Sequence, residues 1–109
     1  MTTTRDAESI SHMLECAQAI LSYMKGRRRA LAKDGMLRDA VLRRFEVMGE
    51  AATRVTPQFR DANPDIPWKR IVAFRNVLIH GYDRIESEQV LVAVDALPDV
   101  VRLLQNLRP

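Results

Sequence analysis

The chain has 109 residues, enough for one domain built around a single hydrophobic core. It is 47% hydrophobic and 28% charged, and no apolar run approaches the roughly 18–20 residues that span a bilayer. A net charge of +3 permits nucleic-acid binding without requiring it. The first six residues lead into no signal-peptide core, and the lone Cys16 excludes an internal disulfide. We therefore expect one soluble, cytoplasmic domain spanning residues 1–109, with no membrane contact.

Two amphipathic helices are predicted in the first half of the chain. Residues 5–25 and about 36–55 repeat apolar side chains in steps of three and four, with Gly26 and Pro57 as the respective stops. The second helix could begin before Met36, with Asp34-Gly35 as a break. Gly49 inside it indicates that another backbone packs close by. The two stripes comprise Ile10, Met13, Leu14, Ala17, Ile20, Leu21 and Met24, then Leu37, Val41, Phe45, Met48, Ala52 and Val55.

The second half begins with a predicted connector and ends with two further helices. Prolines and an Asn-Pro-Asp turn punctuate residues 57–67, which we read as a connector. A third helix is predicted over 67–82, and a fourth begins near Ser87, whose hydroxyl can cap it. Pro98 should kink this last helix. The fold class is therefore all-α, a bundle of four main helices.

One dense basic run, Lys25-Gly26-Arg27-Arg28-Arg29, has two interpretations. It can be a solvated turn and helix start, or it can contact a nucleic-acid backbone. The solvated interpretation is favoured, because a phosphate contact would need independent support.

Metal and carboxylate-pair sites are weakly indicated elsewhere. His12 and Cys16 lie at i and i+4, but no second pair of ligands accompanies them, so Cys16 is interpreted as a small core residue. Glu46 and Glu50 have the same spacing and are expected to pair with nearby arginines. We expect no metal and no cofactor.

Apolar residues off the main stripes favour a homodimer. Short helices in a four-helix bundle rarely bury two faces each, so surplus apolar surface is expected to meet another chain. These residues are Ala19, Ala40, Leu42, Val47 and Ala51.

The candidate site is the stretch 75–82, where Arg75, Asn76, His80 and Tyr82 interrupt an apolar helix. Arg75 and His80 are separated by about 140° of rotation and about 7.5 Å of rise, so one helix does not aim both at one atom. Asn76 and His80, at i and i+4, do share a face. A two-fold axis along this helix would bring the groups of two copies into one composite site.

These residue types suit the cleavage of an RNA phosphodiester without a metal. Imidazole is matched to proton transfer near neutral pH. A guanidinium binds phosphate oxygens in a fork and stabilises charge in the transition state. The nucleophile can be the substrate's own 2′-hydroxyl, so no protein nucleophile is needed.

The spacing of three residues resembles the signature of the HEPN superfamily, in particular its HepT-like toxin branch. In this signature four residues separate an Arg from a His, and one residue separates the His from a Tyr, as in Arg75, His80 and Tyr82. Residues 45–52 resemble that branch's helix-2 signature, and Ile66-Pro67-Trp68 its entry to the following helix. The resemblance covers nearly the whole chain.

The resemblance implies a four-to-five-helix bundle that dimerises and acts as a metal-independent endoribonuclease toxin. Arg75 and His80 would be catalytic and Asn76 supporting. The implied partner is a MntA-like nucleotidyltransferase antitoxin, which would neutralise the toxin by AMPylation of Tyr82. The alternative is a non-catalytic HEPN binding module, or a substrate-presenting partner of a nucleotidyltransferase. A third interpretation is a dimeric adaptor, in which the polar residues of the motif only form hydrogen bonds with one another at the dimer interface.

Overall fold

A computed structural model describes residues 3–107, and every regular element in this range is helical. In chain order the elements are α1 (Thr4–Met24), the 3-10 helix η1 (Arg28–Ala32), α2 (Gly35–Thr53), α3 (Pro57–Ala62), α4 (Trp68–Gly81), the 3-10 helix η2 (Tyr82–Arg84) and α5 (Ser87–Leu107). The predicted all-α class is confirmed. Over the described range, none of the helices combines the length and apolarity needed to cross a lipid bilayer.

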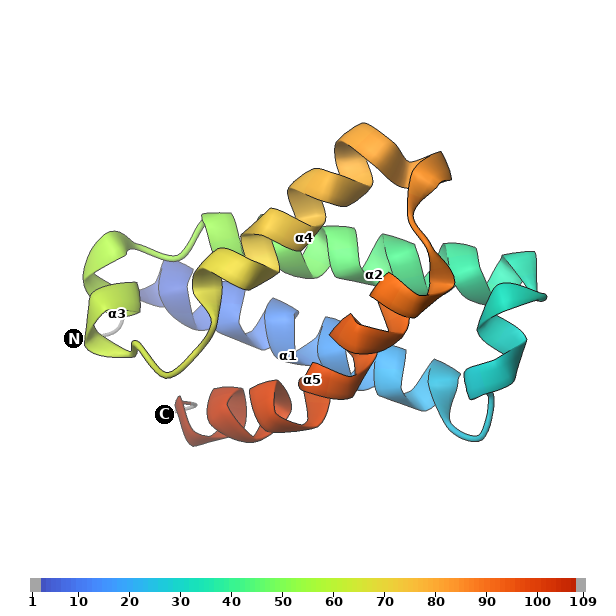
Figure 1. Cartoon of the computed structure of the whole chain (residues 1–109). Coiled ribbons are helices and arrows are strands. Elements are labelled where there is room, and N and C mark those ends of the chain that lie inside the picture. The colour runs from blue at the N-terminus through green and yellow to red at the C-terminus, as the bar shows by residue number, and fades with distance from the viewer. Residues whose placement is uncertain (1–2, 108–109) are drawn as a thin grey trace.

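Helix α2 is the centre of the bundle (Figure 1). It packs against α1 on one side and α4 on the other, while α5 packs against α1. Apolar side chains from α1, α2 and α5 meet between these helices and are almost fully buried. The largest of these fully buried side chains are Met13, Leu14, Ile20, Val41, Leu42, Met48, Val90 and Leu104.

The central position of α2 changes the sequence-based argument for a dimer. Leu42 and Ala51 were expected to lie on surplus apolar surface, but they are only 0% and 2% exposed within one chain. They are buried because α2 has neighbouring helices on two sides. Of that group, Ala40 is exposed, and Ala19 and Val47 are half-buried. These residues therefore give little support to a second copy.

Local capping explains where α1 and α2 begin and end. The Thr3 hydroxyl accepts a hydrogen bond from the Asp6 N–H at 2.9 Å, and Asp34 caps α2 by accepting from the Leu37 N–H at 3.1 Å. Gly26 follows α1 with a φ of +69°, a conformation that glycine adopts without strain. The predicted stop at Gly26 and the break at Asp34-Gly35 are confirmed.

The expectation of a plain connector over 57–67 was wrong in its first half, which forms α3. Thr56 caps this short helix through a hydrogen bond from the Phe59 N–H at 3.2 Å, and Pro57 occupies its first turn. The Phe59 ring enters the core beside Trp68, with ring centroids 6.5 Å apart. The indole N–H of Trp68 donates to the Asn63 carbonyl at 3.0 Å, which fixes the entry to α4.

A buried carboxylate ties the start of α1 to the turn before α3. Asp6 is 1% exposed, and its two oxygens accept from the Thr56 N–H and the Thr56 hydroxyl, each at 2.8 Å. Burial alone would raise the pKa of Asp6, but the hydrogen bonds from Thr56 and Thr3 outweigh it and lower the pKa.

The basic run is used for ion pairs within the chain. Arg27 pairs with Asp34 and Arg28 with Asp95, each with a nitrogen–oxygen distance of 2.6 Å. Both pairs are partly exposed, so each stabilises the fold only slightly. This agrees with the interpretation of the run as a solvated turn.

The acidic pair on α2 behaves in the same way. Glu46 pairs with Arg43 at 3.4 Å and Glu50 with Arg54 at 3.1 Å, as expected from their spacing. These carboxylates are therefore engaged by neighbouring arginines.

Helix α5 differs slightly from expectation at its start. Ser87 is the first helical residue, and its hydroxyl accepts from Arg38 at 3.4 Å, so it does not act as the cap that was predicted. The Gln89 side chain instead accepts from the Glu86 N–H at 2.8 Å. Pro98 lies inside the helix, whose axis changes direction part-way along in Figure 1, as the predicted kink requires.

Candidate active site on helix α4

Helix α4 approaches α2 closely at one glycine. A Cβ atom built on Gly49 would lie 2.2 Å from Arg75 Cβ and 2.8 Å from Arg75 Cγ, so only a glycine allows this approach. The close packing that Gly49 indicated in the sequence is confirmed. It places the stem of the Arg75 side chain directly on the backbone of α2.

The Arg75 side chain is half-buried and has no carboxylate partner among residues 3–107. Its Nη1 donates to the Asn76 side-chain oxygen at 2.8 Å. Its Nε is buried and has no hydrogen-bond partner within the part of the chain that is described. None of the ion pairs among residues 3–107 includes Arg75. The positive charge is therefore held in place without being neutralised.

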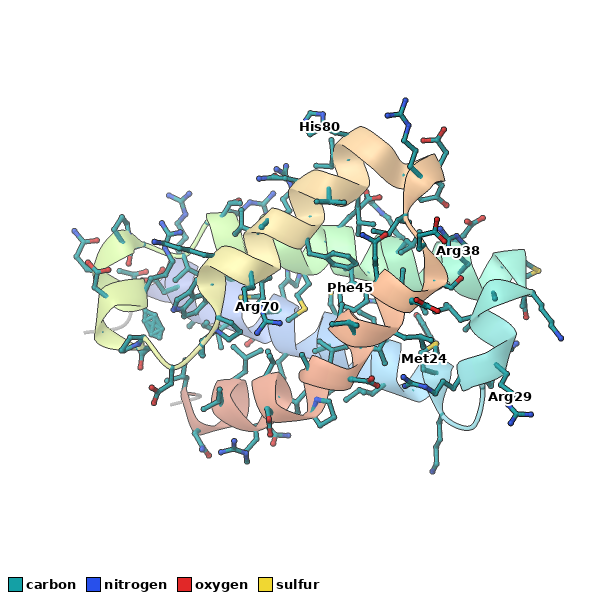
Figure 2. All side chains as sticks on the ribbon, viewed as in Figure 1. Met24, Arg29, Arg38, Phe45, Arg70 and His80 are labelled. Atoms are coloured by element: carbon teal, nitrogen blue, oxygen red, sulfur yellow. The ribbon has the colours of Figure 1, made fainter. Side chains whose placement is uncertain are left out.

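His80 lies in the last turn of α4 and is exposed to solvent (Figure 2). The helical spacing turns its side chain away from the α2-facing side that holds Arg75. Over residues 3–107, no hydrogen bond joins His80 to Arg75. One chain thus brings Arg75 and Asn76 together but leaves His80 apart, in line with the angular argument from the sequence.

Tyr82 is held by a residue that the sequence did not single out. It begins η2, is 41% exposed, and its hydroxyl donates a hydrogen bond to the Asp39 carboxylate of α2. This hydrogen bond, together with partial burial, raises the pKa of the Tyr82 phenol. Asp39 precedes Tyr82 by 43 positions, so only the packing of α4 on α2 brings them together.

The adjoining Arg38 fixes the segment that follows. Its guanidinium donates to the Ile85 carbonyl and to the Ser87 hydroxyl, which anchors the link between α4 and α5 to α2. Two consecutive α2 residues therefore hold the end of the candidate site. No spacing rule in the sequence could have identified them.

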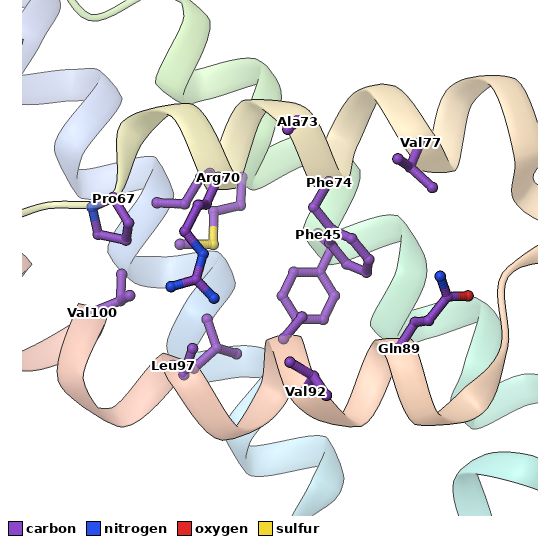
Figure 3. A pocket seen from close by; sticks show the side chains of 14 residues that line it. Phe45, Pro67, Arg70, Ala73, Phe74, Val77, Gln89, Val92, Leu97 and Val100 are labelled. Carbon is purple, nitrogen blue, oxygen red and sulfur yellow. The ribbon is translucent and has the colours of Figure 1, made fainter.

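An open apolar groove of about 340 Å³ runs between α4 and α5, with α2 at its floor (Figure 3). Val77 and Val92 lie on its two walls and are 48% and 62% exposed. Val77 is one helical turn before His80, so the groove adjoins the candidate site. Its other lining residues are Phe45, Met48, Pro67, Arg70, Ile71, Ala73, Phe74, Gln89, Ala93, Ala96, Leu97 and Val100.

Residues 3–107 contain no cluster of three or more histidine, cysteine or acidic side chains arranged to hold a metal ion. Cys16 is 2% exposed and packs in the core, as interpreted from the sequence, and burial raises the pKa of its thiol.

The sequence profile of the family described as "HepT-like: Ribonuclease HepT-like" matches residues 13–107, which include the whole of α4 and Tyr82. The chain belongs to the ribonuclease HepT-like family. The resemblance seen in the sequence is confirmed. No solved structure matches the chain significantly.

Three relatives illustrate the similarity. A protein of Caldanaerobacter subterraneus named as a putative RNase is 32% identical over 98 residues, covering 85% of this chain and 88% of the relative. Another of that name from Methanocaldococcus jannaschii is 34% identical over 84 residues, covering 75% and 77%. A protein of Thermococcus cleftensis named as a probable ribonuclease HepT is 40% identical over 70 residues, covering 63% and 64%.

Proposed function

We propose that this HepT-like chain is an endoribonuclease in which Arg75 and His80 are the catalytic residues and Asn76 supports Arg75. The observation that carries the proposal is the half-buried Arg75 side chain, which forms no ion pair within residues 3–107, on the same helix as the exposed His80. A fixed cation without a carboxylate partner is suited to a phosphate. The names of the relatives point to RNA as the substrate.

The reaction needs no nucleophile from the protein and proceeds without a metal. The 2′-hydroxyl of a ribose attacks the adjacent phosphorus, the new O–P bond forms, and the bond to the 5′-oxygen of the next nucleotide breaks. The products are a 2′,3′-cyclic phosphate and a free 5′-hydroxyl. Arg75 stabilises the charge on the phosphoryl oxygens, and His80 transfers a proton to the leaving oxygen.

A homodimer would complete this site. Arg75 faces α2 while His80 points outward, so the two groups converge only if a second copy supplies the missing member. The groove between α4 and α5 adjoins His80 and offers apolar surface for such a contact. The support for a dimer is thus this groove rather than the residues on α1 and α2.

Regulation by AMPylation of Tyr82 is the second part of the proposal. Arg75 and Tyr82 both contact α2, Arg75 at Gly49 and Tyr82 at Asp39, although Tyr82 lies just beyond the end of α4. Its hydroxyl group lies in a partly exposed position that a nucleotidyltransferase of the MntA type could reach. A bound AMP would add a negative phosphate that pairs with Arg75 or His80 and excludes the substrate RNA.

RNA cleavage by the purified chain tests the nuclease. His80→Ala should remain folded, because His80 is exposed. Both His80→Ala and Arg75→Ala should lose roughly 10²–10⁴-fold in rate. Cleavage should persist in EDTA and leave 2′,3′-cyclic ends. EDTA-sensitive activity, or wild-type rates in His80→Ala, would overturn the assignment. Absence of any cleavage would favour the non-catalytic binding module.

Mixed dimers test whether the site is composite. Arg75→Ala and His80→Ala should each be inactive alone. In a dimer of one protomer of each kind, one of the two sites has an intact Arg75 from one protomer and an intact His80 from the other. Co-refolded mixtures should therefore regain part of the wild-type rate. A mixture as inactive as its components would rule out a site shared in this way.

A further inference from the structure

The Asp39 carboxylate has one hydrogen-bond partner within the described residues, and that partner is the Tyr82 hydroxyl. Asp39 is exposed on α2, and none of the ion pairs over residues 3–107 includes it. A free carboxylate that accepts from a hydroxyl is the arrangement by which a base activates an oxygen nucleophile.

The phenol is also fixed in direction. Arg38 holds the backbone at Ile85 and the Ser87 side chain, so the segment around Tyr82 is attached to α2 on the side of Asp39. The charged groups of α2 that act on the phenol are Asp39, Arg38 and Glu46. Because its pKa is raised, the phenol keeps its proton at neutral pH, so any reaction of this oxygen must remove that proton during the step.

We propose that Asp39 orients the Tyr82 hydroxyl and accepts its proton when AMP is transferred to it; this rests on the AMPylation proposed above. In this step the Tyr82 oxygen attacks the α-phosphorus of ATP. The O–P bond forms as the bond to pyrophosphate breaks, and the phenolic proton passes to the Asp39 carboxylate and then to water. This chain itself thereby supplies the base for its own modification.

The transfer rate with ATP, magnesium and a MntA-like nucleotidyltransferase tests this role, with AMP on Tyr82 measured by mass spectrometry. Asp39→Asn keeps an oxygen that accepts the hydrogen bond but cannot take the proton. Its kcat for AMP transfer should fall by about 10²–10⁴-fold while KM for the toxin stays close to wild type. Asp39→Glu should recover part of the rate. Asp83→Asn, next to Tyr82 in sequence, is the matched control and should react like wild type.

Two results contradict the proposal in different ways. If wild type is modified and Asp39→Asn reacts equally fast, Asp39 is not the base, although the AMPylation stands. If wild type acquires no AMP on Tyr82, the proposed regulation fails and the role of Asp39 fails with it. Melting curves of both Asp39 variants check that the fold is retained.

A spectroscopic titration tests the contact without any partner enzyme. In a Tyr23→Phe background, Tyr82 is the remaining tyrosine, and its ionisation is followed by ultraviolet absorbance. Asp39→Asn should shift this ionisation to lower pH, because the neutral amide no longer places a negative charge beside the phenolate. An unchanged midpoint would show that Asp39 does not hold the phenol in solution and would overturn the proposal.

Discussion

Gly49 determines how closely α4 can approach α2 and therefore where Arg75 lies. An added Cβ would overlap Arg75 Cβ, which belongs to the stem of the side chain and cannot swing away without moving α4. Gly49→Ala should therefore destabilise the fold by about 1–3 kcal/mol, as overpacking does, and should lower RNA cleavage. Urea denaturation and the cleavage assay measure the two effects.

The matched control for this substitution is Gly35→Ala. Gly35 is also helical, but a Cβ there would meet no atom within 4 Å. Alanine should be neutral or stabilise by up to about 1 kcal/mol at such a position. Equal stability for both alanine variants would contradict the tight contact at Arg75.

Asp6 should make stability depend on pH in the acid range. Its pKa in the folded state lies below the ordinary value of 3.8, so its contribution is complete above that value and is lost as the pH falls through the lowered pKa. Asp6→Asn should cost about 1–3 kcal/mol at pH 7 and reduce the loss of stability below about pH 4. Urea midpoints measured from pH 7 to pH 3 test this.

Asp61→Asn serves as the comparison for Asp6, because Asp61 is exposed on α3. The urea midpoints of Asp61→Asn should match those of the wild type from pH 7 to pH 3. A wild-type acid profile in Asp6→Asn would mean that the bonds to Thr56 do not hold the turn before α3.

At the scale of elements, apolar periodicity predicted the four long helices because each turns an apolar stripe toward the core, although the stripe of α4 is only partly buried. It missed α3, whose six residues are too short to show a period. The helix could still have been recognised from its cap, since Thr56 followed by Pro57 is a typical helix start. Short helices are thus better predicted from their ends than from their faces.

The candidate site was predictable only where its residues are neighbours in sequence. Arg75, Asn76, His80 and Tyr82 fall within eight positions of one helix and could be found as a motif. Asp39 reaches Tyr82 through the packing of two helices, and no local pattern carries that information.

For the whole molecule, the groove between α4 and α5 predicts self-association. We expect light scattering to give about twice the 12.5 kDa mass of one chain. Val92→Glu should yield monomers with reduced cleavage, because it adds a charge to the apolar wall of the groove. It should change the stability of a single chain little, because Val92 is 62% exposed. Met36→Glu is the control, since Met36 is 85% exposed and does not line the groove.

A wild-type chain that remains monomeric at micromolar concentrations would contradict this expectation. If Val92→Glu still dimerises, the interface lies outside the groove, and the composite site does not form through the surface proposed here.

Helix α4 packs mainly against α2, and its side toward α5 borders the open groove. A helix with one principal neighbour can separate from the bundle at a lower free energy than global unfolding requires. Its amide hydrogens should therefore exchange with deuterium faster than those of α1, and raising the protein concentration should slow that exchange. The proposed catalytic groups would thus lie on a helix that opens more readily than α1 in the isolated chain, and association would reduce this opening.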